Sequence, residues 1–283
     1  MNTLYFTNPF HLGDCMFCII FFNNIIYYIE KNNIIINFSC HLQYRKQLNE
    51  FIMSPNIVLS DFDNIDRLNL WIGNNKLPFN IFNQTPNMSL NQFLLEFYNN
   101  IILNNQVLFG NLPILETKIF QYTDPDLITR YNKLNEKYKD IDILIVNSDC
   151  MSGQCSNDRT YWNDIINMYN KKYKIVTTNK IENINCTLDD DLTLKDIGAI
   201  STHTKIIIAV NTGVITSFYN SYTLNNVLQV YYIDNTRYYD YIKWSKINDI
   251  TDMTDIMIDK YLITRELFDM YSKNYPLINK MCL

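Results

Sequence analysis

Glycine and proline are scarce in this chain of 283 residues, which has 6 glycines and 7 prolines. No glycines form the GxGxxG pattern of a dinucleotide-binding turn, which argues against a nicotinamide or flavin enzyme. Basic charge is scarce as well, since the net charge is -5 and the isoelectric point is about 5.2. This acidity argues against a nucleic-acid partner held by general electrostatic attraction.

A long hydrophobic run is also absent. The most apolar stretch, residues 16–29, is interrupted by Asn23 and Asn24 and is shorter than the roughly 20 residues that a membrane span needs. No basic segment precedes it and no small-residue cleavage site follows it. We therefore expect neither stable membrane insertion nor a signal peptide, and we expect this stretch to be a buried helix.

The cysteines lack the repeated spacing of a disulfide framework, and their number, 7, is odd. This pattern predicts free thiols in a reducing compartment, which we take to be the cytoplasm. Cys15 and Cys18 form a CxxC, but no second CxxC completes a zinc site. Core packing is therefore the favoured interpretation of this pair.

What the chain has in quantity is apolar and aromatic residues. Hydrophobic residues make up 47% of it, with 21 tyrosines and 16 phenylalanines, which is typical of a folded protein. Asparagine and isoleucine are also frequent, as in proteins of AT-rich genomes, so a single asparagine carries little meaning.

Short apolar segments alternate with amphipathic ones along the chain, which predicts an α/β fold with parallel sheets. Strands are expected at residues 34–38, 56–60, 141–147, 173–177 and 227–232, and helices at residues 41–52, 90–103, 126–138, 158–170, 192–200 and 252–270.

A strand, a turn and a helix follow one another in the same way twice. The first copy has its strand at residues 4–6, its turn at 7–14 and a helix to residue 29; the second has them at 206–210, 211–213 and 214–222. Each turn contains a glycine, which permits a close turn, and each helix start offers free N–H groups that attract phosphate. The repetition predicts two facing α/β halves that bind a phosphorylated ligand between them.

Three stretches resemble the glycosyltransferase family that includes the bacterial heptosyltransferases of lipopolysaccharide synthesis (glycosyltransferase family 9). They are residues 11–14 (HLGD), residues 153–162, and residues 191–200 (DLTLKDIGAI) together with the strand at Lys205 and the turn NTG at 211–213. The order and spacing of these stretches cover most of the chain.

The resemblance implies a GT-B fold, in which two Rossmann-like domains face each other across a cleft. We expect an acceptor-side domain at residues 1–130 and a nucleotide-sugar donor domain at residues 131–283, and it stays open whether the final helix crosses back. The implied activity is an inverting, metal-independent glycosyltransferase without a cofactor. It would transfer a sugar from a nucleotide-sugar donor to a glycan or lipid-linked acceptor.

The resemblance also implies roles for single residues. Asp14 corresponds to the family's catalytic base, and His11 and Gly13 belong to the same acceptor-side turn. Candidate donor-binding residues, which would face the diphosphate, are Ser152, Gly153, Arg159, Asn211, Thr212, Gly213 and Val214.

Physical reasoning adds expectations for these side chains. At a helix start, the helix dipole should keep the pKa of Asp14 low, and capping of that helix is the alternative role for this residue. Arg159 could equally be a surface arginine. Lys195 is expected to be a solvated helix residue, and His41 and His203 are assigned no catalytic role.

Two other functions stay open. Asn211 stands where the family has an acidic residue and Thr216 where it has a histidine, which favours a non-catalytic sugar-binding or scaffold protein. Asp61 and Asp63 follow an apolar strand like the DxD of GT-A glycosyltransferases, where paired carboxylates hold a divalent ion.

Overall fold

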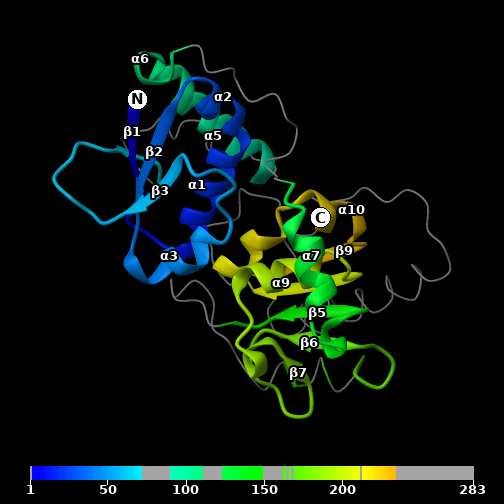
Figure 1. Ribbon diagram of the computed structural model, residues 1–283. Coiled ribbons are helices and arrows are strands. Elements are labelled where there is room, and N and C mark those ends of the chain that lie inside the picture. Colours follow the sequence, from blue (N-terminus) through cyan, green and yellow to red (C-terminus); the bar gives the residue numbers. More distant parts are fainter. Residues whose placement is uncertain are drawn as a thin grey trace, which may run out of the picture.

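Two α/β units, each built on a parallel sheet, make up the computed structural model shown in Figure 1. It describes residues 2–71, 90–110, 123–148, 162–163, 166, 169–210 and 212–233. The predicted helix at residues 252–270 and most of the predicted helix at residues 158–170 lie outside these ranges.

The first sheet has four strands in the order β3-β2-β1-β4, and every pair is parallel. Its strands are β1 (Asn2–Thr7), β2 (Ile34–Ser39), β3 (Ile57–Ser60) and β4 (Leu68–Asn69). Side chains of β1 and β2 alternate between buried and partly buried positions, because one face of the sheet packs on helices.

Helix α1 forms the centre of the first unit (Figure 1). Phe22 on α1 contacts Phe6 and Phe38 of the sheet, and Phe21 stacks on Tyr98 of α5. Helix α1 is therefore enclosed between the sheet and α5. The helices of this unit are α1 (Leu12–Asn24), α2 (Ile26–Lys31), α3 (Leu42–Asn49), α5 (Leu90–Asn104) and α6 (Gln106–Phe109).

The stretch at residues 16–29 is buried along α1, as predicted, but it is not one helix. A break at Ile25 separates α1 from α2. In the part of the chain that the structure describes, no helix is both long and apolar enough to span a bilayer.

The second sheet has five parallel strands in the order β7-β6-β5-β8-β9. They are β5 (Ile143–Val146), β6 (Ile175–Thr177), β7 (Asn185–Cys186), β8 (Ile206–Val210) and β9 (Gln229–Ile233). Numbered within the unit, this is the order 3-2-1-4-5 of a Rossmann fold, and the first sheet has the order 3-2-1-4. The predicted fold class, two Rossmann-like α/β units, is confirmed.

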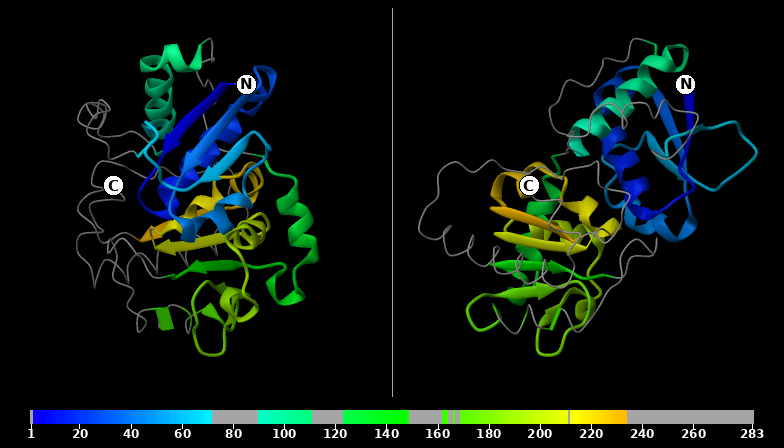
Figure 2. Two further views of the ribbon diagram at one scale, coloured as in Figure 1. Left: turned by 60° about the vertical axis from the view of Figure 1, so that its left-hand side comes forward. Right: turned by 180° about the vertical axis from the view of Figure 1, so that it is seen from behind.

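Helix α9 and the 3-10 helix η3 complete the core of the second unit, where Ile197 and Phe218 pack with strand residues such as Ile207. The elements outside its sheet are α7 (Asp126–Lys133), η1 (Glu136–Tyr138), η2 (Thr187–Asp190), α9 (Leu194–Ser201), η3 (Gly213–Phe218) and α10 (Ser221–Asn226). Helix α7 packs on α9, and the two views of Figure 2 show it beside the second sheet. The division at residues 130 and 131 stays a prediction.

The helix expected at residues 214–222 is the main error in the predicted elements. The chain instead forms the six-residue 3-10 helix η3, and α10 begins only at Ser221. The hydroxyls of Thr216 and Ser217 donate to the carbonyls of Gly213 and Val214, three residues earlier, at 2.6 Å and 2.8 Å. These bonds offer the backbone carbonyls partners other than an α-helical ladder.

Candidate functional site

The topology of each sheet points to one of the two repeated turns. In an open parallel sheet, ligands bind outside the carboxyl ends of the strands, where the strand order reverses. This switch point lies between β1 and β4 in the first sheet and between β5 and β8 in the second. The turn after β1 leads to Asp14, and the turn after β8 leads to Gly213.

The two turns touch each other through their glycines. A Cβ atom added to Gly213 would lie 3.0 Å from the main-chain nitrogen of Gly13, and one added to Gly13 would lie 3.3 Å from the Cα atom of Gly213. Neither glycine has a positive φ. Both glycines therefore serve close approach between the two units. The sequence had instead predicted that they permit the turns themselves.

Asn8 organises the first turn from a fully buried position. The side-chain oxygen of Asn8 accepts from the main-chain N–H of Phe10 at 3.1 Å, and the main-chain N–H of Asn8 donates to the carbonyl of Ser39 at 3.1 Å. Helix α1 then begins at Leu12, with His11 as its N-cap. His11, Gly13 and Asp14 are thus brought together at the start of α1, as predicted.

Asp14 is partly buried at the third position of α1, and burial raises its pKa from an ordinary 3.8 to about 6. The charge of His11 and the main-chain N–H groups of His11 and Asp14 act in the opposite direction but do not outweigh burial. The expectation of a low pKa was therefore wrong, because desolvation exceeds the effect of the helix start. A carboxylate with a pKa near 6 is a better general base at neutral pH than an ordinary aspartate.

Two thiols lie behind Asp14. Cys15 and Cys18 are fully buried, and Cys18 accepts from the side-chain amide of Asn8 at 3.5 Å and from the hydroxyl of Tyr98 at 3.7 Å. Burial raises the pKa of Cys18 to about 12 and that of Cys15 well above its ordinary value. The prediction of core packing for this CxxC is confirmed, since buried neutral thiols are unreactive.

The second turn presents a buried hydroxyl. Thr212 is 8% exposed and is the N-cap of η3, and its Oγ1 atom has no hydrogen-bond partner within the described residues. The first N–H groups of a helix, here those of Gly213 and Val214, find no acceptor inside that helix. The predicted donor-binding residues Ser152, Gly153, Arg159 and Asn211 lie outside the described residues.

The DxD pair of the alternative function is occupied by arginines. Arg67 binds both oxygens of Asp63, at 2.9 Å and 2.8 Å, and Arg45 forms an ion pair with Asp61. A divalent ion would have to displace both guanidinium groups, so the geometry does not favour the GT-A interpretation. In the described ranges, no three or more metal-ligating side chains gather into a site.

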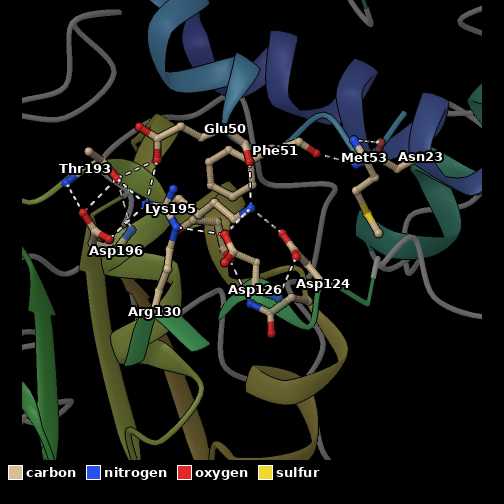
Figure 3. Close-up of polar contacts among 12 residues, drawn as sticks. Asn23, Glu50, Phe51, Met53, Asp124, Asp126, Arg130, Thr193, Lys195 and Asp196 are labelled. Atoms are coloured by element: carbon tan, nitrogen blue, oxygen red, sulfur yellow. Dashed lines mark hydrogen bonds and ion pairs between the residues drawn. The ribbon is translucent and has the colours of Figure 1, made fainter. Parts of the chain in front are cut away.

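Lys195 is not the solvated residue that the sequence predicted. It is 6% exposed, and its ammonium lies 2.8 Å from Asp124, 3.1 Å from Asp126 and 2.7 Å from the carbonyl of Glu50 (Figure 3). Glu50 belongs to the first unit, 145 residues away in sequence. The local sequence around Lys195 therefore does not predict that Lys195 is buried.

The two histidines without an assigned role have structural contacts. The Nε2 atom of His41 lies 2.9 Å from the carbonyl of Pro9, and His203 stacks on Tyr131 with ring centroids 3.7 Å apart. Among the residues to which the sequence assigned no role, Asn8 is the one that a sequence pattern could have indicated. Its Asn-Pro dipeptide after a strand is a turn pattern.

No protein-family model matches this chain, and no curated protein matches it significantly in sequence. Several solved structures are similar to it. A glycosyl transferase of family 9 from Veillonella parvula DSM 2008 has 10% sequence identity and a TM-score of 0.46, over 93% of this chain and 91% of that chain.

Two further structures come from E. coli. The iron-containing dodecameric glycosyltransferase TibC of enterotoxigenic strain H10407 has 14% identity and a TM-score of 0.47, over 86% of this chain and 61% of that chain. The heptosyltransferase WaaC, solved with ADP, has 7% identity and a TM-score of 0.46, over 98% of this chain and 100% of that chain. The first two are named as glycosyltransferases and the third as a heptosyltransferase.

Proposed function

We propose that this chain is an inverting glycosyltransferase that moves a sugar from a nucleotide-sugar donor to a hydroxyl of a glycan or lipid-linked acceptor, without a metal ion. The observation that carries the proposal is the contact of Gly13 with Gly213. It brings the residue expected to act as base, Asp14, next to the turn expected to bind the donor. The buried free thiols are in keeping with a cytoplasmic location.

The first half of the reaction is deprotonation and attack. The carboxylate of Asp14 takes the proton of the acceptor hydroxyl while the hydroxyl oxygen forms a bond to the anomeric carbon of the donor sugar. The attack comes from the face opposite the diphosphate, so the configuration at that carbon inverts. The protonated Asp14 then releases its proton to water.

The second half is departure of the nucleoside diphosphate, whose oxygen keeps the electron pair of the broken bond. The hydroxyl of Thr212 and the main-chain N–H groups of Gly213 and Val214 are suited to stabilise this negative charge. The arginine partners of Asp61 and Asp63 support a reaction without a divalent ion, because they occupy the carboxylates that would hold one.

The proposal is tested by measuring thermal unfolding of the full chain with a panel of nucleoside diphosphates and nucleotide sugars, with and without EDTA. The nucleotide sugar that stabilises the protein is then incubated with it, and its hydrolysis is followed by mass spectrometry. We expect stabilisation by one nucleotide base, no effect of EDTA, and slow release of the free sugar.

The other outcomes contradict the proposal in different ways. Stabilisation that EDTA abolishes would favour a metal ion at Asp61 and Asp63. Stabilisation without any hydrolysis would favour the non-catalytic sugar-binding protein. Absence of stabilisation by every compound would exclude a donor site at Thr212 and leave a scaffold as the better explanation.

A further inference from the structure

A second contact between the two units is polar and surrounds Lys195. The end of α3, at Glu50 and Phe51, meets the start of α9 and the segment that leads into α7 (Figure 3). Glu50 and Phe51 belong to the first unit, whereas Lys195 belongs to the second. This contact therefore joins the units at a place other than the two glycines.

The ammonium of Lys195 lies at the centre of this contact. It donates to the main-chain carbonyl of Glu50 at 2.7 Å and forms ion pairs with Asp124 at 2.8 Å and Asp126 at 3.1 Å. It also lies over the ring of Phe51, 5.9 Å from the centroid. The ammonium therefore makes one hydrogen bond to the first unit and has two carboxylates as charge partners.

Arg130 on α7 extends the contact to the carboxylate of Glu50. Its guanidinium forms ion pairs with Glu50, Asp126 and Asp196, each at 3.0 Å. The hydroxyl of Thr193 donates to the same carboxylate of Glu50 at 2.9 Å. Two cations and four carboxylates thus share one partly buried network, so removal of either cation leaves negative charges unpaired.

The network is connected to both turns of the candidate site. On the first unit, Asn23 of α1 donates to the carbonyl of Phe51 at 2.8 Å and accepts from the N–H of Met53 at 3.3 Å (Figure 3). Asp14 is on that same helix. On the second unit, α9 packs on η3 so closely that a Cβ atom on Gly198 would lie 3.2 Å from the carbonyl oxygen of Ser217.

We propose that Lys195 is a positioning residue, which fixes the end of α3 to α9 and thereby holds the turn of Asp14 against the turn of Gly213. It does not contact the substrate. Its effect passes through two rigid connections, Asn23 with α1 and Gly198 with η3. The inference rests on the proposed function only where it concerns the rate of sugar transfer.

The test compares Lys195→Met with Lys205→Met in the full chain. Methionine keeps an apolar stem over Phe51 but removes the charge. Lys205 is the matched control, because its ion pair with Asp142 is within the second unit and its side chain is 49% exposed. Asp124→Asn is a milder second variant, since it removes one charge partner of Lys195 and keeps the size of the side chain.

The first readout is hydrogen exchange measured by mass spectrometry, which does not depend on any substrate. In Lys195→Met we expect amide exchange to become at least about tenfold faster in peptides covering both turns, at residues 10–16 and 212–218. Asp124→Asn should give the same pattern with a smaller increase. Lys205→Met should leave both turns unchanged.

The second readout is kinetic. Because a small misplacement of reacting groups is costly, we expect kcat of Lys195→Met to fall by about 10-fold to 100-fold while KM for the donor stays within about threefold. Faster exchange confined to residues 123–130 and 190–201 would overturn the inference, and so would an unchanged kcat. If the unaltered chain shows no transfer at all, the proposed function fails, and exchange at the two turns still decides whether Lys195 holds them together.

Discussion

The turn after β1 and the turn after β8 have similar sequence patterns but lead into different helices. The first opens the 13-residue helix α1, whose side chains from Cys15 to Phe22 are buried. The second opens the six-residue 3-10 helix η3. The difference shows that similar turn patterns do not determine which kind of helix follows, because a 13-residue α-helix follows the first turn and a 3-10 helix follows the second.

The same comparison bears on the two chemical roles that we propose for the turns. The first turn carries an acid whose pKa burial raises to about 6, which suits proton transfer. The second carries no acid or base in its described part, but it has a buried hydroxyl and main-chain N–H groups, which suit an anion. The turns therefore differ in the way that a base and a leaving-group site must differ.

The largest expected effect tests the role of the first turn. Asp14→Asn keeps the shape of the side chain but removes the general base, so donor turnover should fall by about 10²-fold to 10⁴-fold. Nucleotide binding, which we assign to the second turn, should change little, and this is measured by thermal stabilisation. The exposed Asp66 provides the control Asp66→Asn. A variant Asp14→Asn with full turnover would return Asp14 to a structural role.

The pH dependence of turnover gives the next largest effect. Since the base must be ionised, kcat/KM should rise about tenfold per pH unit below a midpoint near 6 and level off above it. The charge of His11 lowers the pKa of Asp14, so His11→Asn should move the midpoint to higher pH. A midpoint near the ordinary value of 3.8 would show that burial does not act on this carboxyl.

The raised pKa has a consequence for stability as well. The folded chain binds the proton of Asp14 more tightly than the unfolded chain, whose carboxyl has the ordinary pKa of 3.8. The contribution of Asp14 protonation to the free energy of unfolding is therefore complete below pH 3.8, and it is lost as the pH rises through about 6. Urea unfolding of the unaltered chain and of Asp14→Asn across this range would isolate the contribution.

The contact between the turns is tested by adding one methyl group at a time. In Gly213→Ala the new carbon would meet the nitrogen of Gly13 at 3.0 Å and Cβ of Leu12 at 3.3 Å. Overpacking of this kind should lower the free energy of unfolding by about 1 to 3 kcal/mol. Denaturant unfolding measures the change, and donor turnover should fall with it if the turns are pushed apart.

Gly13→Ala tests the same contact from the first turn. Its closest contact, with Cα of Gly213, is longer at 3.3 Å, and alanine inside a helix gains about 0.5 to 1 kcal/mol over glycine. We therefore expect a smaller loss at Gly13 than at Gly213. Equal losses would mean that the steric cost of the methyl group is larger at Gly13 than at Gly213, by the amount that alanine gains in the helix.

The sequence predicts well what depends on neighbouring residues. Helix α9 was expected at residues 192–200 and extends from Leu194 to Ser201, with Thr193 and Asp196 forming a capping box at its start. The parallel order of both sheets follows from the alternation of strands and helices. The positions of His11, Gly13 and Asp14 at a helix start also follow from their own segment.

Contacts between distant segments explain what the sequence did not predict. Lys195 is buried because Glu50 and Phe51 cover it from the other unit. The pKa of Asp14 is raised by burial, and its neighbour Gly13 contacts Gly213 of the other unit. In both cases the contacting residues are far away in the sequence, so the local sequence pattern does not predict the contact.

The smallest expected effect concerns the hydroxyls that distinguish η3 from α1. Ser217→Ala keeps the Cβ atom beside Gly198 but removes the fully buried hydroxyl that donates to the carbonyl of Val214 at 2.8 Å. The loss of one such bond should lower the free energy of unfolding by about 1 kcal/mol. Thr129→Ala, at an exposed position of α7, is the control and should change it by no more than about 0.5 kcal/mol. Because alanine favours α-helix, an increase in stability would instead mean that the Ser217 hydroxyl holds η3 in its 3-10 form at a cost in free energy.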